Sequence, residues 1–238
     1  MKILGIKIAN LTRKEVLEKI DLFLNEEKFH QIATVNPEFI LAAQKDQEFK
    51  NILNSTDLNV ADGVGIWYAF IRNFGYLKTR ITGVDLMDIV LQKAQQKNLA
   101  IYLAISKHSL SSYEEIKTAL NKKYPKLKIL GSDINMGDYH ENWFDDKLPI
   151  KNDFVLLCNF GAPRQEKFIQ SVKSDTIRLA MGVGGSFDFL TKKVRRGPKV
   201  MRKLGLEWLW RFILEPKYRA KRIFKAVIIF PIKVIFSK

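Results

Sequence analysis

The sequence has few of the residues on which disulfide-bonded, metal-binding and membrane-spanning proteins depend. Its 238 residues include one cysteine, Cys158, and three histidines, His30, His108 and His140. A single cysteine excludes a disulfide framework and a multi-cysteine metal site, and it suits a reducing compartment. The histidines lack the spacing of a metal-binding pair. No apolar run reaches the roughly 18 residues needed to cross a bilayer, and we expect no signal peptide at the amino terminus.

Several nucleotide-binding and catalytic motifs are also missing. The glycine-rich stretch 182–188 does not fit G-x-G-x-x-G, because Phe187 occupies the third glycine position and the stretch lies late in the chain. Neither a GK[ST] phosphate loop nor a G-x-S-x-G nucleophile elbow is present. The sequence therefore does not predict a nicotinamide enzyme, a P-loop protein or a serine hydrolase. A glycine-rich turn can equally contact a nucleotide sugar, with Asp188 accepting hydrogen bonds from a base or ribose.

Positive charge is abundant and is concentrated towards the carboxyl terminus. The net charge is +15. Residues 191–238 carry 15 lysines and arginines against Glu207 and Glu215, a net charge of +13, whereas residues 1–190 carry only +2. A nearly neutral body with a strongly basic end indicates an anionic partner, either lipid headgroups and phosphates or nucleic acid.

Hydrophobic patterning predicts strands that alternate with helices. Thr12 and Glu15 form the sequence pattern of a capping box at the start of one helix, and another helix is expected over 109–123. The alternation predicts an α/β, Rossmann-like fold with a substantial parallel portion. We divide the chain into an α/β catalytic domain, residues 1–194, and a basic helical appendage, residues 195–238, called the tail below. The expected strands are 2–9, 30–35, 58–61, 99–105, 127–130, 154–159 (expected to be central, being strongly apolar) and 177–181.

The most informative stretch is Val60-Ala61-Asp62-Gly63-Val64-Gly65. A short apolar strand ends here in an acid followed by glycines, which places Asp62 at the carboxyl edge of the sheet, where open α/β folds bind ligands. Gly63 and Gly65 have no Cβ and so allow close approach of backbone or substrate. The stretch alone leaves two roles open for Asp62, a helix cap or a catalytic carboxylate.

Other polar residues follow predicted strands or precede predicted helices. Thr34 and Asn36 lie two apart on one strand and therefore point to the same side. Asn36 also suits a helix cap before Pro37. Arg80 comes just before a helix that starts near Thr82 or Gly83, a position that suits an anionic ligand such as phosphate; the alternative is a surface ion pair with Asp85.

The tail has an amphipathic pattern. Leu206, Leu209, Trp210 and Ile213 recur at helical spacing, and an apolar stripe continues over 223–228 beside lysines and arginines until Pro231 breaks or kinks the helix. Aromatic, apolar and basic residues together favour a helix lying in a membrane interface. The alternative is a helix packed on the body with solvated basic residues.

Seven stretches in one order resemble the WecG/TagA/CpsF family of bacterial glycosyltransferases. They span nearly the whole chain, and each would be weak evidence alone. They are 34–38 (TVNPE), 61–65 (ADGVG), 80–85 (RITGVD), 161–166 (GAPRQE), 182–189, 195–198 (RRGP) and 205–211 (GLEWLWR) with Glu215-Pro216.

The resemblance implies an enzyme that moves an N-acetylmannosamine-type sugar from a UDP donor to polyprenyl-diphosphate-linked N-acetylglucosamine, as in the teichoic acid linkage unit. It implies an inverting reaction without a metal or other cofactor, with Asp62 as general base and with arginines to stabilise the departing diphosphate. The residues expected to be catalytic are Asp62, Thr34, Arg80, Gln165 and Arg211. Those expected to bind substrate are Asn36, Gly63, Gly184, Gly185, Asp188, Glu166, Arg219 and Arg222.

Two segments depart from the family pattern. Residues 104–108 replace a glycine-rich turn, and Lys217 and Tyr218 displace Arg219 from its expected place after Glu-Pro. We expect a peripheral protein on the cytoplasmic face of the bacterial membrane, with a UDP-sugar, a lipid-diphosphate acceptor and anionic lipid as partners and no nucleic acid. A nucleic-acid-binding protein and a non-catalytic membrane scaffold are the alternatives, and self-association is left open.

Overall fold

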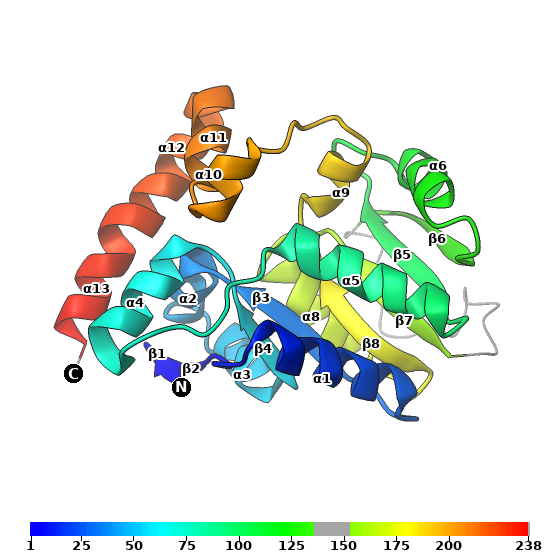
Figure 1. Cartoon of the computed structure of the whole chain (residues 1–238), viewed down its shortest axis with the longest axis horizontal. Coiled ribbons are helices and arrows are strands. Elements are labelled where there is room, and N and C mark those ends of the chain that lie inside the picture. Colours follow the sequence, from blue (N-terminus) through cyan, green and yellow to red (C-terminus); the bar gives the residue numbers. More distant parts are fainter. Residues whose placement is uncertain (136–152, 238) are drawn as a thin grey trace.

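The computed structural model describes residues 1–135 and 153–237 and confirms the predicted α/β fold. Its main sheet has six strands, every neighbouring pair of which is parallel, in the order β4-β3-β8-β7-β5-β6 (Figure 1). The strongly apolar strand predicted over 154–159 is central, as expected. The strands are β3 Gln31–Val35, β4 Leu58–Ala61, β5 Ala100–Ser106, β6 Ile129–Ile134, β7 Phe154–Cys158 and β8 Ile177–Gly182.

Helices cover both faces of this sheet (Figure 1). Alternate side chains of a strand point to opposite faces, so the side chains of the buried strands pack against one helical layer on each face of the sheet. One layer consists of α1 Arg13–Asn25, α5 Gly83–Gln96, α6 Tyr113–Lys123 and α9 Ser186–Leu190. The other consists of α2 Pro37–Ala43, α3 Gln47–Ser55, α4 Val64–Phe74 and α8 Arg164–Ser171.

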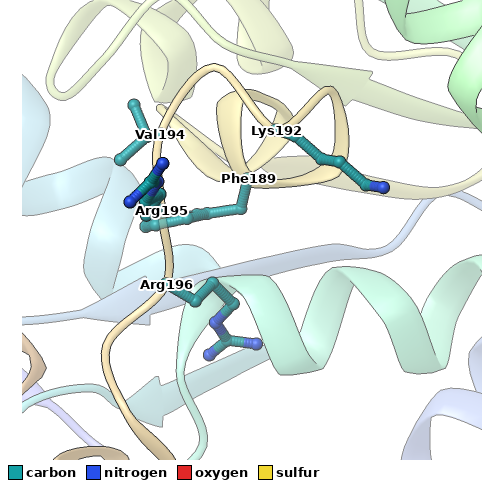
Figure 2. A pocket seen from close by; sticks show the side chains of 5 residues that line it. All are labelled: Phe189, Lys192, Val194, Arg195 and Arg196. Carbon is teal, nitrogen blue, oxygen red and sulfur yellow. The ribbon is translucent and has the colours of Figure 1, made fainter.

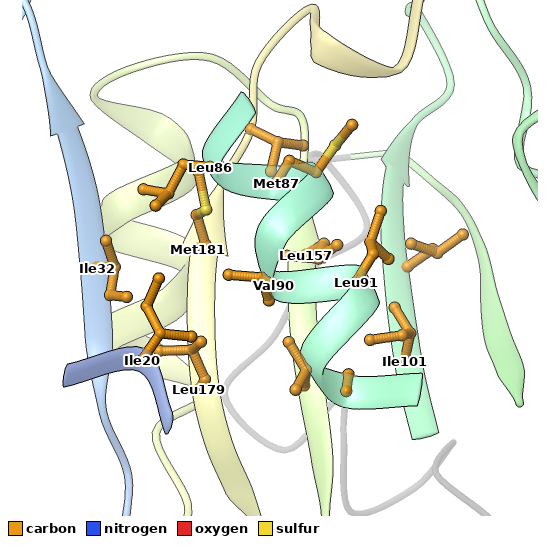
Figure 3. Close-up of a cluster of buried hydrophobic side chains, with 14 of the residues drawn as sticks. Ile20, Ile32, Leu86, Met87, Val90, Leu91, Ile101, Leu157, Leu179 and Met181 are labelled. Atoms are coloured by element: carbon orange, nitrogen blue, oxygen red, sulfur yellow. The ribbon is translucent and has the colours of Figure 1, made fainter. Parts of the chain in front are cut away.

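The largest buried cluster lies beneath α5 and α1 (Figure 3). Leu86, Val90 and Leu91 of α5 pack against Met181 of the central strand β8 and Ile101 of β5, and all five are at most 1% exposed. Burial of each such side chain stabilises the fold by about 1.5–3 kcal/mol. This packing fixes the start of α5, and with it the residues just before the helix, against the carboxyl end of the sheet.

Side-chain caps set several helix starts. The predicted Thr12–Glu15 capping box is present at α1, and the Asn36 side chain accepts hydrogen bonds from the backbone of Glu38 (2.9 Å) and Phe39 (3.1 Å). Thr82 caps α5. The helix predicted over 109–123 begins only at Tyr113, because Ser112 forms the capping box with Glu115.

The amino terminus differs from the prediction. Instead of one strand over 2–9 there is a small antiparallel hairpin, β1 Lys2–Ile3 and β2 Ile6–Lys7, separate from the main sheet. The turn between them places Leu4 at φ 48° and Gly5 at φ 81°, so the extended pattern is interrupted. Ile3 and Ile6 are nevertheless buried, in the cluster shared with α3 and α4.

Strand β5 continues into the segment 104–108, where the sequence was expected to depart from the family pattern. β5 runs through Ser106, whose backbone N–H donates to Asn159 Oδ1 at 2.7 Å, and Lys107 N–H donates to the carbonyl of Ile134 at 3.0 Å. Its partner β6 covers Ile129–Ile134 rather than the predicted 127–130. Residues 104–106 are thus paired with β6 as part of the strand.

The tail packs on the body while keeping an apolar outer side. It forms α10 Lys199–Lys203, α11 Glu207–Leu214, α12 Pro216–Phe224, the π-helical turn η1 Lys225–Ile229 and α13 Phe230–Phe236. Pro231 lies in the first turn of α13, where its missing N–H is tolerated after the π turn. Phe230 and Val234 are buried against α4, beside which α13 runs in Figure 1. In the described part of the chain no helix is both long and apolar enough to span a bilayer.

Candidate active site

The predicted polar residues come together because the strands that carry them are adjacent and parallel. Strands β4, β3, β8 and β7 are consecutive in the sheet, so their carboxyl ends share one edge. A Cβ built on Gly83 would lie 3.3 Å from Thr34 Oγ1 and 3.6 Å from Ser186 Oγ. The end of β3 and the starts of α5 and α9 therefore meet at this edge.

Asp62 lies at the centre of the site. Its backbone N–H donates to the Val35 carbonyl at 2.8 Å, and its half-buried carboxylate accepts a hydrogen bond from the Gly83 backbone. Burial raises the pKa of Asp62 to about 6, although the Gly83 hydrogen bond and the charges of Arg80 and Arg211 act to lower it. Gly63 is the cap residue of α4 and no side chain caps that helix, so the cap role considered for Asp62 is wrong.

Arg80 is held beneath the tail. Its Nη2 donates to the Arg202 carbonyl at 2.9 Å. A Cβ at Gly205 would lie 2.2 Å from Arg80 Nη1, so only glycine allows this contact. The alternative pairing of Arg80 with Asp85 does not form, since Asp85 pairs with Arg196 at 2.9 Å. Arg80 thus joins the predicted site to the tail.

Arg196 and Arg211 connect α11 with α5 and α9. Arg196 also contacts Glu207 of α11 at 3.3 Å, so one guanidinium joins α5 to the tail through two carboxylates. The Arg211 guanidinium lies 4.3 Å from the centre of the Phe189 ring, a cation–π contact. Burial and then repulsion by Arg219 lower the pKa of Arg211 to about 10, which leaves it charged at neutral pH.

Arg219 and Arg222 are held by carboxylates. Arg219 Nε lies 2.6 Å from Glu215 Oε2 within the tail. Arg222 makes a bidentate contact with Glu38 on α2, at 2.6 Å from Nη2 and 2.9 Å from Nε. Both are close enough to Arg211 to lower its pKa, and each has a protein carboxylate as partner.

Gln165 and Glu166 lie inside the protein. Gln165 Oε1 accepts from the backbone N–H groups of Gly161 (3.1 Å) and Gly184 (3.2 Å), and its Nε2 donates to Glu166 Oε1 at 2.7 Å. A Cβ on Gly182 would lie 2.3 Å from Gln165 Nε2, so the amide needs that glycine. Burial raises the pKa of Glu166 to about 8, which favours a neutral carboxyl. The pair joins the β7–α8 loop to the glycine-rich β8–α9 loop.

Of the predicted nucleotide-binding residues, Gly184 and Gly185 lie on the β8–α9 loop and Asp188 lies in the first turn of α9. A Cβ on Gly184 would meet nothing within 4 Å, and Gly185 is exposed. Asp188 Oδ1 accepts from Ser111 Oγ at 2.8 Å, which fixes the carboxylate at the start of α9. The loop therefore has open backbone beside an oriented carboxylate. Across the described residues no group of three or more histidine, cysteine, aspartate or glutamate side chains could hold a metal ion.

Sequence reasoning missed four residues that organise this site. They are Glu38, Phe189, Arg196 and Glu207, and all of them fall within the recognised stretches. Their roles depend on contacts across long chain separations, such as 184 residues between Glu38 and Arg222. The one local signal was their position inside stretches already singled out for other residues.

Comparisons with known proteins find relatives along the length of the chain. The model of the "Glycosyl transferase WecG/TagA/CpsF family" matches residues 1–238. The N-acetylglucosaminyldiphosphoundecaprenol N-acetyl-beta-D-mannosaminyltransferase of Bacillus subtilis (strain 168) is 31% identical over 199 residues, covering 81% of this chain and 74% of the relative. The Staphylococcus aureus (strain MRSA252) protein of the same name is 28% identical over 247 residues, covering 99% and 92%.

Proposed function

Because the chain belongs to the WecG/TagA/CpsF family of glycosyltransferases, we propose that it transfers N-acetylmannosamine from a UDP donor to N-acetylglucosaminyldiphosphoundecaprenol. The acceptor and the transferred sugar are those in the names of the Bacillus and Staphylococcus relatives. The reaction inverts the anomeric centre, needs no metal, and serves synthesis of the teichoic acid linkage unit.

The observation that carries this proposal is the environment of Asp62. A carboxylate whose pKa is about 6 is ionised at neutral pH yet is a stronger base than an ordinary aspartate. In a single displacement it takes the proton of the acceptor hydroxyl as that oxygen bonds to the anomeric carbon. The bond from that carbon to the donor phosphate breaks, and UDP leaves with the electron pair.

Arginines support the departure of UDP without a metal. Arg80 and Arg211 are both close enough to Asp62 to influence its pKa. Positive groups fixed beside the reacting centre stabilise negative charge that develops on the leaving diphosphate. The cation–π contact with Phe189 also holds the Arg211 guanidinium, so its charge is positioned before the donor binds.

We propose that the tail and α4 form the surface that meets an anionic membrane at its cytoplasmic face. Trp67 and Ile71 of α4 and Ile232, Ile235 and Phe236 of α13 are between 43% and 80% exposed. The helices pack together, so these side chains extend one apolar surface. Exposed lysines at 221, 225 and 233 accompany them, and each basic residue near anionic lipid contributes about 1 kcal/mol.

The activity test offers a panel of UDP-sugars and a short-chain lipid-diphosphate-N-acetylglucosamine analogue to the full chain and determines product masses. Addition of one N-acetylhexosamine from UDP-N-acetylmannosamine, with the β-anomer shown by NMR, is the expected result. Binding of UDP without transfer would support the scaffold alternative. Tight binding of duplex DNA with no binding of UDP would contradict the proposal.

The membrane surface is tested with point variants, because deleting the tail would also remove buried Phe230 and Val234 from the core. I232S/I235S should lose binding to vesicles that contain phosphatidylglycerol. The matched double variant L22S/L110S changes two exposed leucines, one on α1 and one in the β5–α6 loop, and should bind like the wild type. Equal vesicle binding by the two variants would contradict the assignment.

A further inference from the structure

A cavity of ≈ 630 Å³ lies on the connection between α9 and the tail (Figure 2). Its walls are Phe189, Lys192, Val194, Arg195 and Arg196. Three of these five residues are cationic and none is acidic. A volume of this order is that of a small-molecule site, and its lining suits an anion.

The cavity holds positive charge that the protein does not neutralise. Arg196 is compensated, since it contacts Asp85 at 2.9 Å and Glu207 at 3.3 Å. Within 1–135 and 153–237, by contrast, no carboxylate forms a salt bridge with Lys192 or Arg195. Figure 2 shows Arg195 beside the Phe189 side chain, whereas the Lys192 side chain extends from the other end of the same loop, away from Arg195. Both residues are exposed, and the flexible lysine side chain can turn towards an anion that Arg195 holds.

One wall of the cavity is also contacted by Arg211, a residue predicted to be catalytic. Phe189, in its wall, is contacted by the guanidinium of Arg196 at 5.7 Å and by that of Arg211 at 4.3 Å. Arg211 in turn is close enough to Asp62 for its charge to act on that carboxylate. Phe189 also directly follows Asp188, which ends the predicted nucleotide-binding stretch. A ligand in the cavity would therefore lie against Phe189, the ring that also contacts Arg211.

We propose that Lys192 and Arg195, with Phe189 as a wall, form a subsite that binds the diphosphate group of a substrate. The subsite rests on the proposed function for the identity of its ligands, which are two diphosphate esters, UDP and the lipid-linked acceptor. Arginine binds phosphate oxygens bidentately and lysine supplies a point charge, so together they can hold two phosphoryl groups. Arg219 and Arg222 have protein carboxylates as partners, whereas Lys192 and Arg195 offer charge that a ligand can use.

The test compares the full-length wild type with K192Q, R195Q and the double variant K192Q/R195Q. Lys199 is exposed on neighbouring α10 and does not line the cavity, so K199Q is a matched loss of one positive charge. Thermal melts establish that each variant is folded. Calorimetry at fixed ionic strength measures binding of inorganic pyrophosphate and of UDP, and steady-state kinetics measures the KM of the soluble acceptor analogue.

The double variant should weaken pyrophosphate binding at least tenfold, while K199Q stays within twofold of the wild type. A weaker affinity for UDP would place the donor's diphosphate in the cavity. A raised KM for the acceptor, with UDP affinity unchanged, would place the acceptor's diphosphate there. Either result supports the subsite.

Two results would overturn it. One is a wild-type protein that binds no pyrophosphate, and the other is a double variant that matches K199Q for pyrophosphate, UDP and acceptor alike. Pyrophosphate binding does not require turnover. Failure of the subsite is therefore distinguishable from failure of the proposed glycosyl transfer, which would leave the pyrophosphate result intact.

Discussion

Replacing Asp62 with asparagine should make the protein more stable and nearly inactive. Burial raises the pKa of Asp62 from its ordinary value of 3.8 to about 6, which means that the folded protein disfavours the charged form. One pKa unit corresponds to about 1.4 kcal/mol. The ionised carboxylate therefore costs up to about 3 kcal/mol of folding free energy at pH 7, an upper limit because the half-buried side chain keeps some hydration.

The sign of the pH dependence follows from linkage. Between pH 3.8 and about 6 the folded state holds the Asp62 proton more tightly than the unfolded state does. Wild-type stability should therefore fall through this window relative to D62N and stay level above it. At pH 4 the two proteins should have similar free energies of unfolding. At pH 7.5 the free energy of unfolding of D62N should exceed that of the wild type by about 1–3 kcal/mol. The side-chain amide oxygen of the D62N variant can still accept the hydrogen bond from Gly83.

Urea denaturation of both proteins at pH 4.0, 5.5 and 7.5 measures this difference. Asp175 is exposed and makes no hydrogen bond or ion pair with the rest of the described chain, so D175N is the matched control and should show no comparable trend. In parallel, turnover by D62N should fall by about 100-fold or more, as expected for a lost general base. If the stability difference between D62N and the wild type were no larger at pH 7.5 than at pH 4, the reasoning on burial would be refuted. Near-wild-type turnover would remove Asp62 from the role of base.

Three further predictions use other parts of the structure. Turnover should survive excess EDTA because arginines are proposed to stabilise the leaving group; restoration only by added Mn²⁺ or Mg²⁺ would contradict this. The stability of the wild type should fall between about pH 4.5 and 8, because the folded state binds the Glu166 proton more tightly than the unfolded state there. E166Q should remove part of this fall. If the denaturation midpoint of E166Q changed with pH as steeply as that of the wild type, the result would argue against a neutral buried carboxyl. F230A should destabilise the whole fold by about 3–5 kcal/mol because Phe230 is fully buried, while F224A, which changes a 55% exposed residue of the same tail, should cost far less in the same urea titration.

Local features of the fold could be predicted because they depend on neighbouring residues. Strand β4 coincides with the predicted 58–61, since a short apolar run is bounded by an acid and a glycine. The Asn36 cap followed from its place before Pro37. The start of α6 was placed too early, because Ser109 and Ser112 are both suitable caps and only Ser112 has Glu115 three residues on. Nothing in the alternation of 2–9 showed that Leu4 would adopt a positive φ.

Parts of the site could be expected from the sequence only as separate residues. Parallel strands bring Thr34, Asp62 and Gln165 to one edge, and this follows from the α/β pattern. The contacts that complete the site join distant segments, as Arg196 joins Asp85 and Glu207, and no spacing in the sequence encodes them. The substrate roles of these residues stay predictions.

The tail connects the two halves of the proposed mechanism, binding at a membrane and activation of the base. Burial is the largest cause of the raised pKa of Asp62, and Glu207 and Arg211 of α11 both act on that carboxylate. The same segment continues through Arg222, which contacts Glu38, to α13, whose buried side packs on α4 and whose outer side is apolar. Because Glu207 acts to raise that pKa and Arg211 to lower it, the position of α11 sets part of the charge environment of Asp62. We therefore infer that contacts which hold the tail on the body also fix the charges around the proposed base.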